Sequence, residues 1–308
     1  MPLPLSSADK IASYGIRGAD PSPSFLAIEL SQAVHRINLI NAWDPAIGPG
    51  TRVLELGCGQ GPCTQALAEA VSSPDGDPAR AGHITAVDPG APDYGAPFTL
   101  AQAQSHLSAG PIGPLVTFHR ADPVDFLAAD TDARWDVAVL AHCIWYFRSA
   151  DTLRQILSAL RGRVARVCLA EWALHATEPA AAAHVLAALA RATFEAHRVD
   201  SVENIQTLAS PRAIKETVGQ AGWEVESEGM VVPDAELSDG FWETGTVVRE
   251  GFVEDVEKEI TEGRVKAVLA SLRDAAIAAA ESAGGVKMVR SMDVWVATLI
   301  PGQLVKSP

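Results

Sequence analysis

Apolar residues recur along the chain in two patterns that alternate, one with helical spacing and one typical of buried strands. Between Ser24 and Trp43 they return every three or four residues, and Asp44-Pro45 ends the pattern, which predicts an N-terminal helix. Beyond it, short apolar runs alternate with helical segments. We predict strands at 52–56, 83–88, 115–119, 135–141, 164–170, 223–232 and 292–300, and helices at 62–71, 99–108, 124–128, 151–160 and 210–220.

This alternation indicates the fold class. Apolar-rich strands separated by helices form a parallel sheet with helices on both faces, so we predict a doubly wound α/β fold. Asp151 is expected to cap its helix. Ser210 is expected to cap the last of these helices, with Pro211 at the first helical position.

Two segments interrupt the alternation, and we interpret both as helical insertions, at about 172–209 and at about 234–290. The first contains an alanine-rich stretch at 179–198. The second contains a region at 252–281 that predicts one solvated amphipathic helix. Its inner face is expected to comprise Val256, Ile260, Val268, Leu269 and Leu272, and its outer face to carry the pairs Glu254/Lys258 and Glu262/Lys266.

Composition and net charge limit the classes of protein to which the chain can belong. The 308 residues are 48% apolar and 20% charged, as in ordinary globular proteins. The net charge of −14 repels phosphate backbones, which makes nucleic acid an unexpected partner. Residues 234–281 hold 12 acidic and 5 basic side chains, so the second insertion carries half of the net charge.

Neither a secretion signal nor a membrane span is indicated. Residues 1–10 lack a basic start followed by an apolar run, and no stretch reaches about 18 consecutive apolar residues. We therefore expect a cytoplasmic protein without a membrane partner. Cysteines stand singly at Cys58, Cys63, Cys143 and Cys168, which favours reduced and buried thiols over a metal site.

The first predicted strand leads into a glycine-rich turn that reads Glu55-Leu56-Gly57-Cys58-Gly59-Gln60-Gly61. Glycines at this spacing let the backbone turn sharply and approach a ligand closely. A dinucleotide fingerprint would need a third glycine where Pro62 stands, which disfavours a nicotinamide oxidoreductase. Glu55 would repel a pyrophosphate and suits the cationic amino-acid end of S-adenosylmethionine.

Two further carboxylates lie at the ends of neighbouring strands. Asp88 ends the second strand, where an acidic side chain can bind both ribose hydroxyls. Asp122 follows the third strand and can accept a hydrogen bond from an adenine amino group. Its position before Pro123 also fits an ordinary helix cap.

With the glycine turn and these carboxylates, the chain resembles the class I S-adenosylmethionine-dependent methyltransferases over roughly 52–170 and the final strands. The resemblance implies a seven-stranded sheet in the order 3-2-1-4-5-7-6, with the seventh strand antiparallel. It implies a domain at 51–308. We expect a helical segment at 1–50 to form part of a lid on this domain. The expected cofactor-binding residues are Tyr14, Glu55, Gly57, Cys58, Gly59, Gly61, Asp88, Pro89 and Asp122.

The methyl acceptor should lie beside the segment after the fourth strand, Ala141-His142-Cys143-Ile144. The resemblance would require an Asn/Asp-Pro-Pro-Tyr/Phe motif here for DNA or glutamine methylation, so that class is disfavoured. His142 is the best-placed general base, although it could equally hydrogen-bond the cofactor or the backbone. Nothing in the sequence calls for a metal. Expected acceptor-wall residues, each with ordinary packing as the alternative, are Trp145, Tyr146, Trp172, His175 and Trp242.

These features favour a small-molecule methyltransferase that acts on oxygen or nitrogen. One alternative is a protein that binds S-adenosylmethionine and catalyses a different reaction or serves as a regulatory partner. Protein methylation is a further alternative, because an acidic surface attracts basic segments. The residues indicate neither the acceptor's identity nor an oligomeric state.

Overall fold

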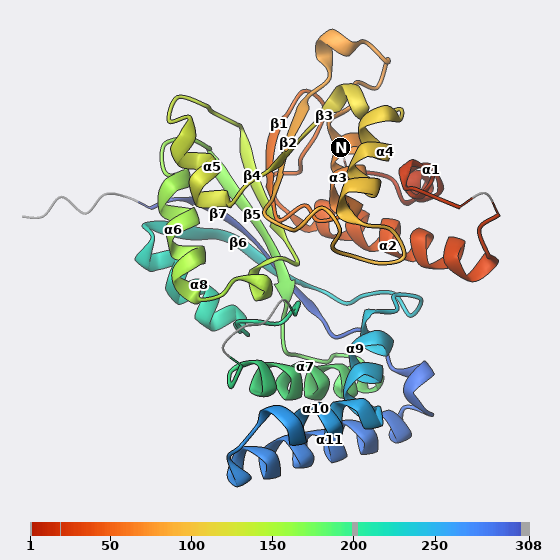
Figure 1. Ribbon diagram of the computed structural model, residues 1–308. Coiled ribbons are helices and arrows are strands. Elements are labelled where there is room, and N and C mark those ends of the chain that lie inside the picture. Colours follow the sequence, from red (N-terminus) through yellow and green to blue (C-terminus); the bar gives the residue numbers. More distant parts are fainter. Residues whose placement is uncertain (1, 19, 199–202, 303–308) are drawn as a thin grey trace, which may run out of the picture.

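The computed structural model describes residues 2–18, 20–198 and 203–302, which are built around one seven-stranded sheet. The strand order is β3-β2-β1-β4-β5-β7-β6, and β7 runs antiparallel to both of its neighbours (Figure 1). The strands are β1 Arg52–Leu56, β2 His83–Asp88, β3 Val116–Arg120, β4 Val137–Ala141, β5 Arg166–Trp172, β6 Trp223–Val231 and β7 Val294–Pro301. The predicted fold class and strand order are confirmed.

Helices cover both faces of this sheet, and the alternation of side chains along each strand explains why. In β1, Val53 packs toward one helical layer and Leu54 toward the other. The first layer comprises α1 Ala8–Tyr14, α2 Pro23–Ala42, α3 Pro62–Val71 and α4 Leu100–Ala109. The second comprises α5 Pro123–Ala129, α6 Ala150–Leu160 and α8 Pro211–Gln220.

The expected helix caps are partly confirmed. Ser210 accepts a hydrogen bond from Ala213 N, with Pro211 at the first position of α8, as predicted. The prediction for Asp151 is wrong, because Ser149 is the N-cap of α6 and Asp151 lies inside the first turn. There its carboxylate binds the guanidinium of Arg154 instead of the backbone.

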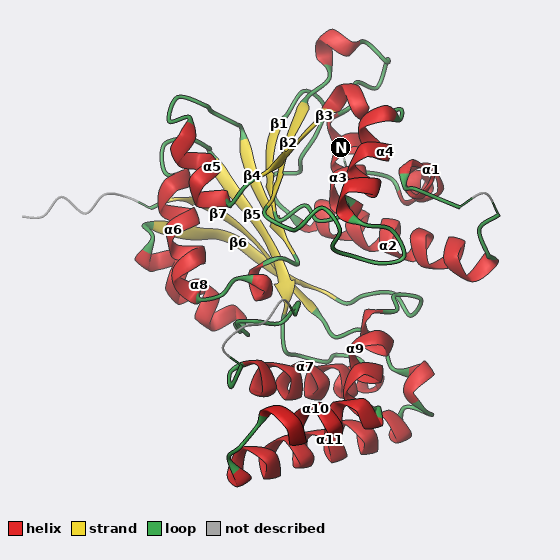
Figure 2. Ribbon diagram, viewed as in Figure 1, coloured by secondary structure: helices red, strands yellow, loops and turns green. Residues whose placement is uncertain are grey.

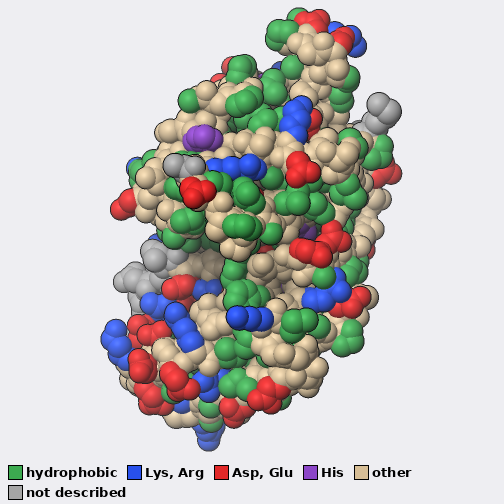
Figure 3. Space-filling model, turned by 90° about the vertical axis from the view of Figure 1, so that its right-hand side faces the viewer, with side chains coloured by type: hydrophobic (Ala, Val, Ile, Leu, Met, Phe, Trp, Pro, Cys, Tyr) green, Lys and Arg blue, Asp and Glu red, His purple; other side chains and the backbone are tan. Residues whose placement is uncertain are grey.

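A second group of helices lies beyond the carboxyl-terminal edge of the sheet (Figure 2). We call this group the lid. It comprises α7 Ala182–Glu195, α9 Asp239–Val248, α10 Glu250–Glu259 and α11 Gly263–Ser282. Figure 3 shows charged side chains crowding the surface of the lid, and a hollow where the lid meets the rest of the molecule.

Part of the prediction for the second insertion is wrong. Residues 252–281 form two helices instead of one, because the chain leaves helical conformation at Ile260 and turns before Gly263. Val256, Ile260 and Leu269 are buried as expected, whereas the side chain of Val268 is 50% exposed. Neither expected charge pair is an ion pair. Lys266 instead binds Glu257 across the break, and Lys258 lies 3.9 Å from Glu259.

Short 3₁₀ turns complete the described chain, and one of them directly follows β4. They are η1 Leu5–Ser7, η2 Pro78–Arg80, η3 Gly113–Leu115, η4 Ile144–Tyr146, η5 Pro179–Ala181 and η6 Val286–Met288. All four cysteines are free and buried, as expected. Across the described residues, no helix has both the length and the apolar character that crossing a bilayer requires.

Candidate cofactor and acceptor site

The three glycines of the turn after β1 have different structural roles. All have positive φ angles, of 76° at Gly57, 53° at Gly59 and 92° at Gly61. A Cβ at Gly57 would lie 2.5 Å from Cys143 Cβ, and one at Gly61 would lie 2.6 Å from Leu107 Cδ1. A Cβ at Gly59 would meet nothing within 4 Å. Packing therefore requires the outer glycines, and the middle one faces open space that a ligand can enter.

Asp88 joins the end of β2 to this turn. Its Oδ2 accepts a hydrogen bond of 2.8 Å from Gly59 N, and its Oδ1 accepts one of 2.7 Å from Gly90 N, just beyond Pro89. A cavity of about 590 Å³ adjoins Asp88 and is also lined by Gln104 on α4. This volume falls within the range of small-ligand pockets.

Asp122 serves as the cap of α5, the alternative that its sequence position left open. Its Oδ1 accepts hydrogen bonds from Val124 N at 2.8 Å and from Asp125 N at 3.2 Å. Both bonds use the same oxygen of an exposed carboxylate. Contact of the other oxygen with an adenine amino group stays a prediction.

Glu55 lies buried beneath the glycine turn and faces the start of α3. Its Oε2 accepts a hydrogen bond of 2.6 Å from Thr64 Oγ1. Burial raises the pKa of Glu55 to about 7. Burial likewise raises the pKa of the neighbouring Cys58 thiol, which is therefore uncharged at neutral pH.

Tyr14 does not reach the turn. Its hydroxyl donates a hydrogen bond of 2.7 Å to Glu69, which also binds Lys10. Glu69 lies about two helical turns along α3 from Gly61. The structure therefore places Tyr14 in the core between α1 and α3, so the prediction that Tyr14 contacts the cofactor is wrong.

A cluster of aromatic rings fills the space beyond the carboxyl ends of β4 and β5. The Nε2 atoms of His142, after β4, and His35, on α2, lie 3.0 Å apart. The ring of Trp172, at the end of β5, lies 4.4 Å from that of His142. His184 of the lid helix α7 meets Trp172 edge to face at 5.1 Å. The cluster thus joins the sheet, the N-terminal helix and the lid.

The two clustered histidines are uncharged. Burial lowers the pKa of both His35 and His142 well below the usual range, so both are neutral at neutral pH. Two neutral rings joined through their Nε2 atoms leave a free lone pair on one of the two Nδ1 atoms. Both Nδ1 atoms are buried without a hydrogen-bond partner, and that of His142 lies 3.7 Å from Glu171 Oε1.

His142 also has an unusual backbone conformation. Its φ angle is 54°, in the left-handed region that a residue with a side chain seldom adopts. Its amide donates a hydrogen bond of 2.8 Å to Ala170 O. Such conformations persist where the surrounding structure fixes them, and they concentrate at functional sites.

Glu171 shapes the loop that carries His142. This buried carboxylate accepts hydrogen bonds from the backbone amides of Ile144, Trp145 and Trp172. Burial raises the pKa of Glu171 to about 7. The side chain is thus enclosed behind the cluster and does not reach the rim of the site.

The expected acceptor-wall residues separate into different environments. Trp172 belongs to the ring cluster, and Tyr146 on η4 is 46% exposed. For Trp145 the structure favours the packing alternative, because this residue is 3% exposed and its Nε1 donates a hydrogen bond to Ala209 O. His175 binds the buried Asp293 at 2.7 Å and otherwise faces outward.

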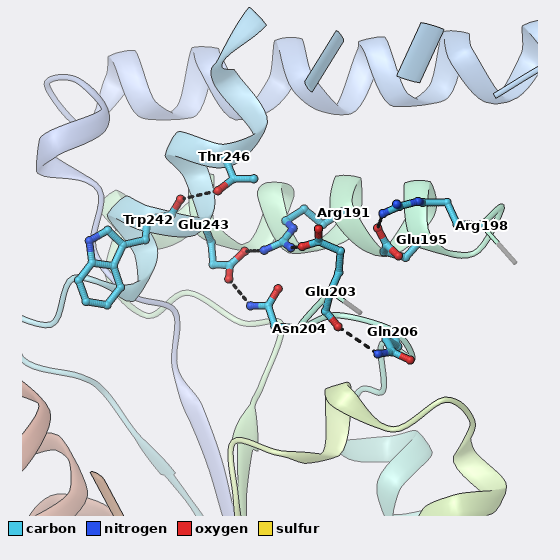
Figure 4. A network of polar contacts seen from close by, with 9 residues as sticks. All are labelled: Arg191, Glu195, Arg198, Glu203, Asn204, Gln206, Trp242, Glu243 and Thr246. Atoms are coloured by element: carbon cyan, nitrogen blue, oxygen red, sulfur yellow. Dashed lines mark hydrogen bonds and ion pairs between the residues drawn. The ribbon is translucent and has the colours of Figure 1, made fainter. Parts of the chain in front are cut away.

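Trp242 lies on α9, at the edge of a polar network that holds the lid together (Figure 4). Arg191 of α7 binds Glu243 of α9 at 2.5 Å and Glu203 at 2.6 Å. Asn204 donates a hydrogen bond of 2.6 Å to the second oxygen of Glu243. Trp242 itself points away from this network and is largely exposed.

Sequence reasoning missed several polar residues that converge on the site, namely His35, Arg36, His184 and Asp239. His35 and Arg36 interrupt the apolar face of the N-terminal helix between Val34 and Ile37, which is the signal that could have found them. His184 and Asp239 lie in the insertions and gave no comparable signal. The described part of the chain holds no group of three His, Cys, Asp or Glu residues able to bind a metal ion.

Comparison with known proteins agrees with this architecture. A family model described as a methyltransferase domain matches residues 25–228. Two relatives from Diaporthe leptostromiformis, Methyltransferase phomM′ and Methyltransferase phomM, are 31% and 32% identical to this chain. Each comparison covers 80% of this chain and 72% of the relative.

Two solved structures are also similar. A cyclopropane-fatty-acyl-phospholipid synthase-like protein from Lactobacillus casei is 29% identical, with a TM-score of 0.81 over 96% of this chain and 100% of the other. The cyclopropane synthase MmaA2 from Mycobacterium tuberculosis is 14% identical, with a TM-score of 0.51 over 96% and 95%, and shares the fold.

The residues present fit the cofactor that this family uses. Gly59 faces open space, Asp88 stands beside a cavity of suitable size, and the turn lacks the third glycine of a dinucleotide site. With the sheet order and a family match over most of its length, the chain belongs to the class I S-adenosylmethionine-dependent methyltransferases.

Proposed function

We propose that the protein methylates an oxygen or nitrogen atom of a small or medium-sized organic molecule. The observation that carries this proposal is the ring cluster at the carboxyl ends of β4 and β5, where the sheet meets the lid. The acceptor would lie between this cluster and the lid, with Trp172 and Tyr146 beside it. The relatives named as methyltransferases support a transfer reaction.

When bound, S-adenosylmethionine supplies a methyl group on a sulfonium, which an acceptor attacks in line. The residues that would hold it are the glycine turn, with Gly59 at its open side, and Asp88 at the ribose. Cys58 and Pro89 flank these two positions, and Asp122 would meet the adenine. The protein's further contribution is to orient the acceptor and to exclude water.

The presence of a lid supports the proposal that water is excluded from the site. We propose that the N-terminal segment 1–50 belongs to the lid functionally, because α2 contacts α9 directly. Gln32 Nε2 of α2 donates a hydrogen bond of 2.9 Å to Asp239 Oδ2 at the start of α9. Acceptor choice would then depend on α2 and on both insertions.

His142 is the proposed proton acceptor. A neutral imidazole accepts a proton from an acceptor hydroxyl or amine as the methyl group is transferred. A proton on His142 Nδ1 would face the carboxyl of Glu171, which stabilises the charged ring. His35 fixes the ring through the Nε2 contact.

The test compares His142→Gln and His35→Gln with the wild type. S-adenosylhomocysteine binding is measured by calorimetry, and turnover is measured as release of S-adenosylhomocysteine in a screen of small hydroxyl and amine compounds. We expect both variants to keep cofactor affinity, and His142→Gln to lower kcat by about 10²-fold or more. Unchanged kcat across the pH range would remove His142 from this role.

Formation of a cyclopropane ring at a carbon–carbon double bond is a second candidate, favoured by similarity to the synthase-like protein from Lactobacillus casei. S-adenosylmethionine with a fully deuterated methyl group distinguishes the two. Transfer to oxygen or nitrogen leaves every deuterium of the methyl group in the product. Formation of a cyclopropane ring loses one of them.

A further inference from the structure

Arg36 is a buried cation without a partner. Arg36 lies in the middle of α2 and is only 9% exposed. Within the described residues it makes no hydrogen bond and no ion pair, and its Nε is sealed from solvent without a partner. A guanidinium presents five donors in a planar fork, and buried arginines are almost always paired.

The surroundings of Arg36 locate it at the centre of the site. Burial raises the pKa of Glu55 beneath the glycine turn, of Glu171 behind the ring cluster and of Asp239 on α9, and the charge of Arg36 opposes each rise. None of these carboxyl groups lies within 4 Å of the guanidinium. Among the described residues, the guanidinium therefore has carboxyl groups in its surroundings but pairs with none of them.

Another buried arginine shows how this chain satisfies such a group when the role is structural. Arg191 is 8% exposed, nearly the same as Arg36, yet it binds Glu243 at 2.5 Å and Glu203 at 2.6 Å. The difference between the two residues is the missing anion at Arg36.

We propose that Arg36 binds a ligand carboxylate at the junction of the cofactor and acceptor positions. A planar carboxylate matches the guanidinium fork and supplies the missing negative charge. Two ligands can bring one to this place: the amino-acid end of the cofactor and an acid group on the acceptor. The inference rests on the cofactor-binding part of the proposed function and not on the acceptor class.

The experiment uses calorimetry on the whole chain with two probes, S-adenosylhomocysteine and 5′-methylthioadenosine, which lacks the amino-acid end. The variants are Arg36→Met, which keeps the length of the side chain, and Arg36→Lys, which keeps the charge. If the cofactor supplies the carboxylate, Arg36→Met weakens S-adenosylhomocysteine binding by about 30-fold or more. Methylthioadenosine binding then stays within about 3-fold of the wild type, and Arg36→Lys restores part of the loss.

If the acceptor supplies the carboxylate, both nucleoside probes bind all variants alike. Benzoate and benzamide are then titrated into the protein saturated with S-adenosylhomocysteine. A preference for benzoate that disappears in Arg36→Met assigns the carboxylate to the acceptor. If neither arm shows a loss that depends on the carboxylate, the inference is overturned. If the wild type binds neither nucleoside, the cofactor site itself is contradicted.

Thermal unfolding of the ligand-free protein provides a second readout. Removal of an unpaired buried charge should leave the Tm of Arg36→Met unchanged or higher. The matched control Arg191→Met leaves the mostly buried carboxylate of Glu243 without its cation and should lower the Tm. Equal destabilisation by both substitutions would show that Arg36 has a structural partner and would overturn the inference.

Discussion

The ion-pair network in Figure 4 should determine how firmly the helices of the lid are held together. Replacement of Glu243 by glutamine keeps the shape of the side chain and removes its charge. Arg191 then retains only Glu203, and the hydrogen bond from Asn204 is left on a neutral amide. Because α7 and α9 are joined directly through Glu243, the substitution acts on the contact between these two helices.

The size of the effect follows from burial. The side chains of Arg191 and Glu243 are 10% and 17% exposed, so their charges are poorly solvated. Loss of one partner of a buried pair costs about 3–5 kcal/mol. The remaining bond to Glu203 reduces this, and we expect about 2–3 kcal/mol for Glu243→Gln. An energy of this size corresponds to an increase of about 30- to 150-fold in the population in which α7 and α9 are separated.

Hydrogen exchange measures this separation directly, since the amides of α7 and α9 exchange when the two helices come apart. The matched control is Asp151→Asn, which removes an ion pair whose side chains are 43% and 52% exposed. Exposed pairs contribute about 0–1 kcal/mol, so the control should hardly change exchange in any helix. Equal exchange in both variants would refute the reasoning that the buried network stabilises the lid.

Further predictions concern the glycine turn and Glu171. Gly57→Ala forces a Cβ against Cys143 and should lower the unfolding free energy in urea by about 2 kcal/mol or more, whereas Gly59→Arg should fold and lose calorimetric binding of S-adenosylhomocysteine. Burial raises the pKa of Glu171 from 4.5 to about 7, so its contribution to stability is present below pH 4.5 and is lost as the pH rises through about 7. The unfolding free energy of the wild type should fall over that range by about 3 kcal/mol more than that of Glu171→Gln. Parallel pH curves for the two proteins would contradict this assignment.

Much of the fold could be predicted because its strands carry a local signal. The apolar runs at 52–56 and 83–88 agree with β1 and β2 at both ends, since a central parallel strand is buried on both faces. The break between α10 and α11 carried no such signal. Both helices are amphipathic, and the turn at Ile260 depends on tertiary packing of that side chain in the lid core.

The candidate site was predictable where one segment of chain contains it. The glycine turn and His142 are fixed by their places after β1 and β4. His35 and Arg36 reach the same site from a helix about a hundred residues away from His142, and their approach depends on how α2 packs on the sheet. The choice between wall and core could not be made for Trp145, because the sequence does not reveal which way a side chain points from a 3₁₀ turn.

The central claim is transfer of a methyl group to a small molecule, and one measurement tests it most directly. The protein is incubated with S-adenosylmethionine carrying a deuterated methyl group and a mixture of small hydroxyl and amine compounds, and products are analysed by mass spectrometry. We expect a labelled small molecule that retains the whole methyl group, formed by the wild type and not by Gly59→Arg. Binding of S-adenosylmethionine with no labelled small molecule, or with label found only on protein, would contradict it.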